Sequence, residues 1–244
     1  MSRPGFLVIE HEDECPPEWF GLWWEQAGIA LRRIRAHDGE PIPGSIADAA
    51  ALIVLGGEAG ANDDGDYPWL PATRRLIGDT VAAGQPFLGI CLGHQLACVA
   101  LGGEVAPNPH GHATGLTPVT LTAAGAGDPL LASFAGTRAV QWNNDVAVRL
   151  PPTGTVLATA PDGTPQAVRF ADRAWGVQFH PEVSPEQFDR WTIDKPSAMQ
   201  ARTDGIDVYA ASRAVHAARA ELQRTWQPLA RRFAELALAG TSWE

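Results

Sequence analysis

The first hundred residues alternate short apolar runs with segments of helical spacing. The apolar runs have the length of buried strands, and they lie at 6–9, 29–34, 51–55 and 86–90. The helix-like segments lie at 17–27, 69–83 and 94–101. Strands joined through helices run parallel, and a parallel sheet is covered on both faces. The order therefore predicts an α/β fold with a mainly parallel central sheet and helices on both faces.

The chain changes character in its second half. Short strand candidates, separated by Pro and Gly turns, lie at 116–121, 139–142, 146–150, 155–160, 166–170 and 175–179. From 185 onward the pattern is mostly helical, and 210–238 keeps helical periodicity throughout. The polar stretch 192–208 is interpreted as a surface loop. We expect a single domain over 1–244, with a core at about 6–190, a small extra set of strands and a C-terminal helical extension at about 191–244.

Composition excludes several classes of protein. Hydrophobic residues make up 45% and charged residues 19% of the chain, which is a globular composition. The net charge of −10 argues against binding to nucleic acid, because such affinity rests largely on cationic contacts. The longest apolar runs are too short to span a membrane, so no membrane partner is expected. Three cysteines cannot form a disulfide framework, and a reduced, cytoplasmic protein is expected.

The segment Gly89-Ile90-Cys91-Leu92-Gly93 lies between an apolar run and a helical segment. This is the cysteine version of a nucleophile elbow, in which small residues two before and two after the nucleophile relieve crowding at a tight turn. Such a turn lifts the thiol off the sheet edge, and the helix N-terminus behind it favours an anion. The alternative for this segment by itself is a buried structural cysteine beside two packing glycines.

A second segment, His180-Pro181-Glu182, ends the last strand candidate. Residues i and i+2 project to the same side of an extended chain, so Glu182 can hold one ring nitrogen of His180 while the other faces Cys91. That order supplies a nucleophile, a base and a group that orients the base. An isolated His-x-Glu is more often an ordinary surface pair. Both segments fall at the C-terminal ends of strand candidates, where open α/β sheets carry their sites.

A third segment places Gly56 and Gly57 directly after the apolar run at 51–55. Glycines leave backbone N–H groups unobstructed by side chains. The amide of Gly57, together with the amide of Leu92 at the elbow, can form an oxyanion hole. A pair of glycines after a strand is a weak signal by itself, since plain turns have the same composition.

The three segments together resemble the class I, or triad, glutamine amidotransferase family, and specifically its stand-alone guanylate-synthase-like members. The resemblance rests on Leu88-Gly89-Ile90-Cys91-Leu92-Gly93-His94-Gln95, Gly56-Gly57 and Gln178-Phe179-His180-Pro181-Glu182, and it covers about residues 6–190. It implies a flavodoxin-like fold and a site in which each of these residues has a role. The implied roles are a thiolate at Cys91, a base at His180, an orienting carboxylate at Glu182, oxyanion amides at Gly57 and Leu92, and a substrate-pocket wall at Gln95.

The sequence departs from the family pattern at two positions. Many members have Pro after the glycine pair, where this chain has Glu58. Many have His in the segment that helps to frame glutamine, where this chain has Asn143 followed by Asn144. Both asparagines are therefore candidate substrate-binding residues. No metal and no organic cofactor is expected, because His110-Gly111-His112 has no further ligand pattern around it.

The activity that the resemblance implies is hydrolysis of the glutamine side-chain amide through a cysteinyl thioester. A γ-glutamyl hydrolase or transferase would use the same acyl chemistry on another γ-glutamyl compound, so it remains the alternative. A non-catalytic regulatory module is the second alternative. The 244 residues contain no phosphate-binding loop, so an acceptor reaction is either absent or carried out by a synthetase partner in trans.

Overall fold

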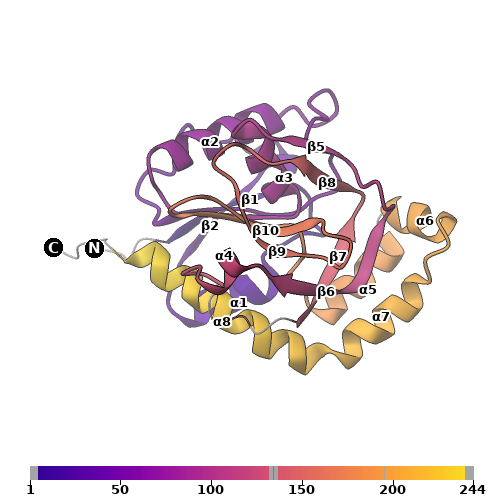
Figure 1. Cartoon of the computed structure of the whole chain (residues 1–244). Helices are drawn as coiled ribbons and strands as arrows, with labels where there is room; N and C mark the ends of the chain where they lie inside the picture. Colours follow the sequence, from indigo (N-terminus) through magenta and orange to yellow (C-terminus); the bar gives the residue numbers. More distant parts are fainter. Residues whose placement is uncertain (1–4, 132–133, 135–136, 195, 240–244) are drawn as a thin grey trace.

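A large mixed sheet organises the computed structural model, which describes residues 5–131, 134, 137–194 and 196–239 (Figure 1). Its strand order is β2-β1-β3-β4-β11-β10-β9-β6-β7. The first five strands in that order are parallel: β1 (Phe6–Glu10), β2 (Leu31–Arg35), β3 (Ala51–Val54), β4 (Phe87–Ile90) and β11 (Ala174–Val177). The sequence-based expectation of a parallel α/β core is confirmed.

Antiparallel strands continue the same sheet beyond β11. They are β6 (Ala113–Leu121), β7 (Thr137–Asn143), β9 (Thr155–Thr159) and β10 (Pro165–Ala171). A separate two-stranded sheet pairs β5 (Glu104–Pro107) with β8 (Asp145–Arg149). The predicted extra strands are therefore present, although β5 was not predicted. Its four residues alternate weakly and contain a proline, so they carry little strand signal.

Helices cover both faces of the sheet, as the order of elements predicts. The helices in the first half of the chain are α1 (Glu18–Gln26), α2 (Leu70–Ala82), α3 (Leu92–Ala100) and the short α4 (Ala123–Ala126), with a 3₁₀ turn η1 (Ala36–Asp38). Alternate residues of β1 enter two different cores, because successive side chains of a strand point to opposite faces. Phe6 and Val8 join the core beneath α1, whereas Leu7 and Ile9 join the core beneath α2 and α3.

The C-terminal part forms α5 (Pro185–Asp194), α6 (Pro196–Thr203), α7 (Val208–Ala217) and α8 (Arg219–Leu238). The prediction of a surface loop over 192–208 is wrong, because α5 extends into it and α6 lies within it. The segment is polar because the only buried residues of α6 are Ala198 and Ala201. The single helix predicted over 210–238 is divided at Ala218.

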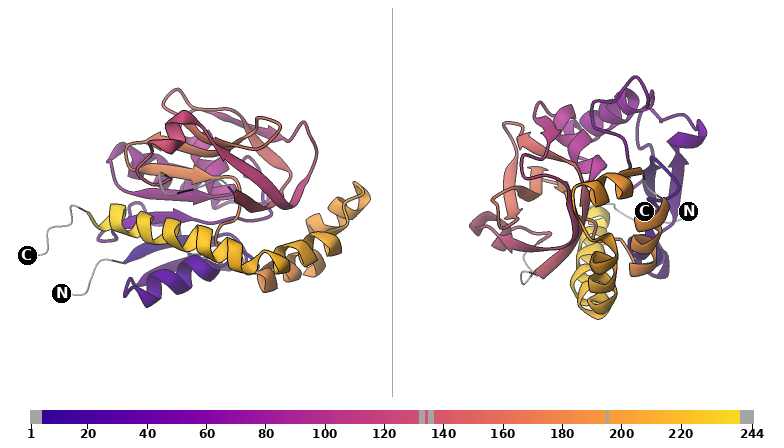
Figure 2. Two further views of the ribbon diagram at one scale, coloured as in Figure 1. Left: turned by 60° about the horizontal axis from the view of Figure 1, so that its bottom comes forward. Right: turned by 90° about the vertical axis from the view of Figure 1, so that its right-hand side faces the viewer.

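The last helix, α8, runs along α1 on one face of the sheet (Figure 2). Trp24 of α1 donates an indole hydrogen bond of 2.9 Å to the carbonyl oxygen of Ala230 in α8. The C-terminal helical extension therefore packs on the same hydrophobic core as Phe6 and Val8 of β1. Among the helices of the described residues, none has both the length and the apolar character needed to cross a membrane.

Candidate active site

Cys91 lies in the single-residue turn between β4 and α3. Its backbone has φ 49° and ψ −105°, a left-handed conformation that non-glycine residues rarely adopt. The flanking glycines have no room for side chains. A Cβ atom on Gly89 would lie 2.6 Å from the carbonyl carbon of Gly93, and one on Gly93 would lie 2.0 Å from the carbonyl oxygen of Val54. The turn therefore has the strained backbone and the crowding that characterise a nucleophile elbow.

His180 follows β11 and lies beside the elbow. Its amide donates a 2.8 Å hydrogen bond to the carbonyl oxygen of Val140, which fixes the backbone. Its Nδ1 atom lies 2.8 Å from Oε1 of Glu182, and both side chains are fully buried. The indole of Trp191 packs edge-on against the imidazole, with ring centroids 4.6 Å apart. Since Nδ1 faces Glu182, Nε2 is the ring nitrogen left for the hydrogen bond between His180 and the Cys91 side chain.

The charge state of His180 follows from its surroundings. Burial by itself lowers the pKa of this imidazole, whereas the charges on Cys91 and Glu182 and the hydrogen bonds to both raise it, to about 10. His180 therefore holds its proton at neutral pH, beside the side chain of Cys91. A cysteine next to a protonated imidazole is the arrangement that activates a thiol for attack on a carbonyl carbon.

Gln178 is a site residue beyond those that the sequence motifs predicted. Its Nε2 atom donates to Sγ of Cys91 at 3.6 Å, and its Oε1 accepts from Nε2 of Gln95 at 3.3 Å. Gln95 also donates to the carbonyl oxygen of Asp145 at 2.9 Å. The available signal was the spacing, because Gln178 lies two residues before His180 and so projects to the same side of the extended chain.

The two glycines after β3 approach the elbow closely. A Cβ atom on Gly56 would lie 2.8 Å from Cε1 of His180 and 3.6 Å from Cβ of Cys91. A Cβ atom on Gly57 would lie 3.2 Å from Cδ2 of Leu92. Leu92 is the first residue of α3, so its amide has no acceptor within that helix. The backbone amides of Gly57 and Leu92, which are expected to bind an oxyanion, therefore lie on neighbouring segments beside Cys91.

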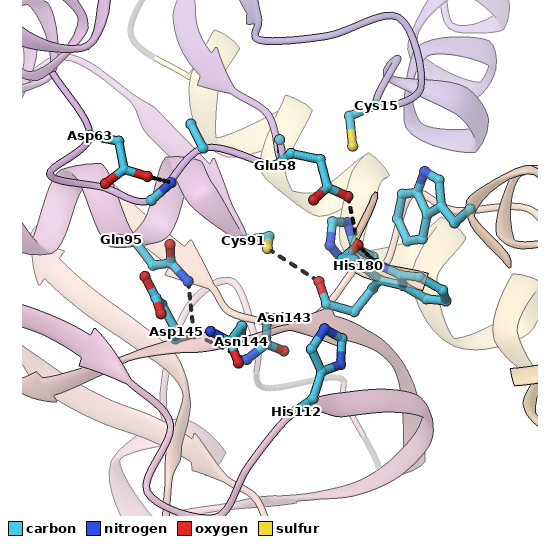
Figure 3. Close-up of a pocket in the computed structure, with 16 residues that line it drawn as sticks. Cys15, Glu58, Asp63, Cys91, Gln95, His112, Asn143, Asn144, Asp145 and His180 are labelled. Atoms are coloured by element: carbon cyan, nitrogen blue, oxygen red, sulfur yellow. Dashed lines mark hydrogen bonds between the residues drawn. The ribbon is translucent and has the colours of Figure 1, made fainter. Parts of the chain in front are cut away.

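A cavity of about 310 Å³ opens above the thiol (Figure 3). Cys91, His180, Gly57, Gln95, Asn143 and Asn144 all line it, whereas Glu182 lies behind His180. Gln95, Asn144 and Asp145 lie to one side of Cys91, and His180 lies to the other. The structure therefore gathers the residues that the sequence suggested for catalysis and for binding around one pocket.

The wall beside Gln95 is rich in hydrogen-bond acceptors. Asp63 and Asp145 line it, and burial together with the nearby Asp63 charge raises the pKa of Asp145. Asn143 donates from Nδ2 to the carbonyl oxygen of Asp145 at 3.1 Å, and its buried Oδ1 has no protein partner. The described residues that line the cavity include no Lys or Arg. This wall suits a ligand that presents an ammonium group.

The opposite wall is closed by α6, a helix in the segment where the sequence predicts a loop. Trp142 donates from Nε1 to Oγ of Ser197 at 2.7 Å, and that hydroxyl donates to Oε1 of Glu58 at 2.6 Å. Glu58 and Ser197 therefore complete the pocket on the side of His180. Neither was predicted as a site residue. Glu58 was noted only as a departure from the family pattern, and Ser197 belongs to no motif, and its contact depends on how the C-terminal helices fold.

Three further Cys and His residues near the elbow differ in their surroundings. Cys98 is buried in the α3 core, and burial raises the pKa of its thiol to about 11. His94 is fully buried against Phe170, and burial lowers the pKa of its imidazole to about 4. His112 lines the cavity and bonds through Nδ1 to Oγ1 of Thr114 at 2.7 Å. In the described ranges, no group of three or more His, Cys, Asp or Glu is arranged to hold a metal ion.

The family model for class-I glutamine amidotransferases matches residues 29–196. YfeJ of Salmonella typhimurium, a putative glutamine amidotransferase-like protein, is 33% identical over 168 residues, which cover 67% of this chain and 70% of that protein. This chain therefore belongs to the class-I glutamine amidotransferase family. A glutamine amidotransferase from Thermotoga maritima has the same fold, with a TM-score of 0.83, 23% identity and coverage of 95% of this chain and 98% of that one.

Two further relatives differ in the reaction that their names describe. A glutamine-hydrolysing GMP synthase of Aeropyrum pernix is 31% identical over 205 residues, which cover 80% of this chain and 36% of that protein. A γ-glutamyl-L-1-hydroxyisopropylamide hydrolase of a Pseudomonas species is 39% identical over 111 residues, which cover 42% of this chain and 37% of that protein. The alignments with these two relatives thus span little more than a third of their lengths.

Proposed function

We propose that this protein hydrolyses the side-chain amide of glutamine to glutamate and ammonia, with Cys91 as nucleophile, His180 as acid and base, and Glu182 as the orienting carboxylate. The observation that carries the proposal is the strained Cys91 elbow, which faces a buried His180–Glu182 pair at the floor of a cavity. Membership of the class-I family supports the same reaction.

In the first half of the reaction, the Cys91 thiolate attacks the γ-carbonyl carbon of the substrate. The carbonyl π electrons move to oxygen, and the amides of Gly57 and Leu92 stabilise the resulting oxyanion. The oxyanion then collapses, the carbon–nitrogen bond breaks, and the imidazolium of His180 gives its proton to the departing nitrogen. The products of this half are ammonia, a γ-glutamyl thioester on Cys91 and a neutral His180.

In the second half, neutral His180 removes a proton from water as the water oxygen attacks the thioester. The carbon–sulfur bond breaks, glutamate leaves, and the thiolate–imidazolium pair is restored. Glu182 holds Nδ1 of His180 throughout, so that Nε2 remains the atom that exchanges protons. In this proposal the α-ammonium group of the substrate binds the wall of Asp63, Asn143 and Asp145, whose acceptor oxygens support that role.

A γ-glutamyl amide hydrolase is the second candidate, and the Pseudomonas relative favours it. That enzyme, by its name, acts on a γ-glutamyl amide whose nitrogen carries a hydroxyalkyl group. The acyl half of the substrate would be the same, and only the leaving amine on the His180 side of the pocket would differ. A substituted amine would have to fit beside Glu58 and Ser197.

We further propose that a synthetase partner receives the ammonia. The GMP synthase relative is named for both a synthetic reaction and glutamine hydrolysis. The alignment with this chain covers 36% of that protein, so most of the relative's length lies outside the aligned part. Among the described residues, one cavity lies at the proposed nucleophile, and no separate site for a substrate that would accept ammonia is identified. The partner would dock on the face around Gly57, Cys91 and His180, because ammonia leaves from there.

The test is to incubate the purified chain with glutamine and with a panel of γ-glutamyl N-alkylamides, and to measure amine and glutamate release. Turnover of glutamine that rises when a synthetase from a neighbouring gene is added supports the amidotransferase. Higher kcat/KM on a substituted amide, unchanged by any partner, supports the hydrolase instead. Binding of glutamine without turnover would contradict both and favour a regulatory module.

A further inference from the structure

We propose that Glu12 is a positioning residue that holds the oxyanion loop, defined as Gly56, Gly57 and Glu58, in its working conformation. This proposal rests on the proposed function, since it assigns Gly57 an oxyanion amide. Glu12 lies outside every motif of the sequence and does not line the cavity. It acts through the backbone of the loop, and it touches neither the substrate nor Cys91 in the proposed reaction.

The topology brings Glu12 to the loop. β1 and β3 are parallel neighbours in register, with Ile9 beside Val54, so the residues that follow the two strands emerge at the same edge of the sheet. There the Glu12 carboxylate accepts the backbone N–H of Glu58 through Oε2 at 2.9 Å. Its other oxygen accepts the thiol of Cys15 at 3.0 Å, which fixes the orientation of the carboxylate.

The loop needs such an anchor because of its two glycines. Neither position has room for a side chain, since a Cβ atom on Gly56 would meet His180 and one on Gly57 would lie 2.8 Å from Cβ of His11. Glycine is therefore required for space, but it also has the widest backbone freedom of any residue. The contacts with residues 11 and 12 restrict that freedom from outside the loop.

His11 supports the same loop sterically. Its imidazole is buried, and its Nδ1 accepts a hydrogen bond of 3.0 Å from Nε1 of Trp69. This bond fixes the ring, which together with Cβ of His11 faces Gly57. His11 thus limits the loop on one side, and Glu12 holds the next peptide group by a charge-assisted hydrogen bond, which is stronger than a neutral one.

The Glu12 contact is expected to affect the transition state of the reaction specifically. An oxyanion amide accelerates the reaction only when its direction is fixed before charge develops on the substrate oxygen. Loss of the Glu12 anchor releases the peptide that follows Gly57 and disorders the oxyanion hole. The side chains of Cys91 and His180 are held by Gln178 and Glu182 instead, so their arrangement remains intact.

The experiment compares Glu12→Ala, Glu12→Gln and Asp13→Ala with the full wild-type chain. Two rates are measured: turnover of whichever amide the wild type hydrolyses, and alkylation of Cys91 by iodoacetamide, which needs a thiolate but no oxyanion hole. Asp13→Ala is the matched control, because it removes an exposed carboxylate from the same loop, where Arg35 contacts it. Glu12→Gln keeps an acceptor oxygen for the Glu58 amide.

We expect Glu12→Ala to lower kcat about 10- to 100-fold, somewhat less than outright removal of an oxyanion donor, with little change in KM. The alkylation rate is expected to stay at the wild-type value, and Glu12→Gln and Asp13→Ala are expected to retain most of the turnover. If Glu12→Ala does not fold, Glu12→Asp supplies the test, since it withdraws the carboxylate by one methylene and is expected to lower kcat about tenfold.

Three results would overturn the positioning role. These are wild-type kcat in Glu12→Ala, an equal fall of alkylation and turnover, or a loss in Glu12→Gln as large as that in Glu12→Ala. A wild-type chain that hydrolyses no γ-glutamyl amide would instead refute the proposed function, so the two failures are distinguishable.

Discussion

Gly56 and His180 are so close that a Cβ atom on the glycine would lie 2.8 Å from Cε1 of the imidazole. Real Cβ atoms essentially never approach another carbon so closely, so one of the two must move if a methyl group is added. The imidazole is held by Glu182 and packed against Trp191, which leaves it little freedom to yield. The position of the proposed base thus depends on a residue with no side chain.

The first prediction is that Gly56→Ala lowers kcat about 100-fold, because displacing an acid–base group by about 1 Å has an effect of that size. Gly78→Ala is the matched control, since a Cβ atom there meets nothing within 4 Å in the middle of α2. The control is expected to keep full activity and to gain up to about 1 kcal/mol in free energy of unfolding. Steady-state kinetics and thermal denaturation of both variants check this, and an active Gly56→Ala would contradict it.

The second prediction concerns the dependence of activity on pH. His180 must carry a proton to protonate the departing amine, and its pKa is raised to about 10, so activity is lost as pH rises through about 10. The charge of Glu182 contributes to that raised pKa. Glu182→Gln removes the charge and is expected to move the alkaline limb of the kcat/KM profile to lower pH, with exposed Glu186→Gln as the control. An unshifted limb in Glu182→Gln would show that Glu182 does not set the charge state of His180.

The third prediction concerns stability in acid. Burial lowers the pKa of His94 to about 4, whereas the unfolded chain takes up a proton near pH 6.5. A depressed pKa in the folded state gives stability that is present above pH 6.5 and is lost as pH falls toward 4. The loss amounts to about 2 kcal/mol at pH 5 relative to pH 7.

His94→Leu removes the titrating imidazole and with it this pH-dependent contribution to the free energy of unfolding. Leucine fills the apolar site beside Phe170, and it brings no nitrogen atoms that lack hydrogen-bond partners. We expect the difference in free energy of unfolding between pH 7 and pH 5 to shrink by about 2 kcal/mol in His94→Leu and to stay unchanged in His110→Ala, where the imidazole is exposed. Urea denaturation at the two pH values measures the difference. Equal pH dependence in His94→Leu and wild type would contradict the assignment.

The fourth prediction identifies the nucleophile by chemistry. A glutamine analogue that carries an electrophilic ketone is expected to label Cys91 alone, because the Cys98 thiol is buried and its pKa is raised to about 11. Cys91→Ala is expected to lower turnover at least about 10³-fold, and Cys98→Ala is expected to keep most of it. Mass spectrometry of the labelled peptides makes the assignment, and a stoichiometric label on Cys15 or Cys98 would refute it.

The sequence predicted the fold and the motifs because both depend on local patterns. The strand at 87–90 and the helix that follows are visible in apolar periodicity, and Cys91 is marked by its flanking glycines. Ser197 could not be predicted, since its place in the pocket depends on how α6 packs. Glu12 could not be predicted either, because its contact with Glu58 joins residues 46 positions apart through the pairing of β1 with β3.

The last prediction addresses the wall that α6 completes. The Ser197 hydroxyl accepts from Trp142 and donates to Glu58, so its removal leaves an indole N–H and a carboxylate oxygen without this bridge. The Glu58 carboxylate then moves into the side of the cavity that holds the leaving amine. We expect Ser197→Ala to raise KM for the preferred amide about tenfold and to lower the free energy of unfolding by about 1 kcal/mol.

Ser197→Ala is also expected to change the ratio of kcat/KM between glutamine and a γ-glutamyl N-alkylamide, because the altered wall faces the amine and not the glutamyl group. Thr203→Ala is the matched control, since it removes a hydroxyl from the end of the same helix, where Thr203 donates to the carbonyl oxygen of Met199. The control is expected to keep both the KM and the substrate ratio of the wild type. A Ser197→Ala variant with lower stability but an unchanged ratio would show that the bridge supports the fold without shaping the leaving-group side of the pocket.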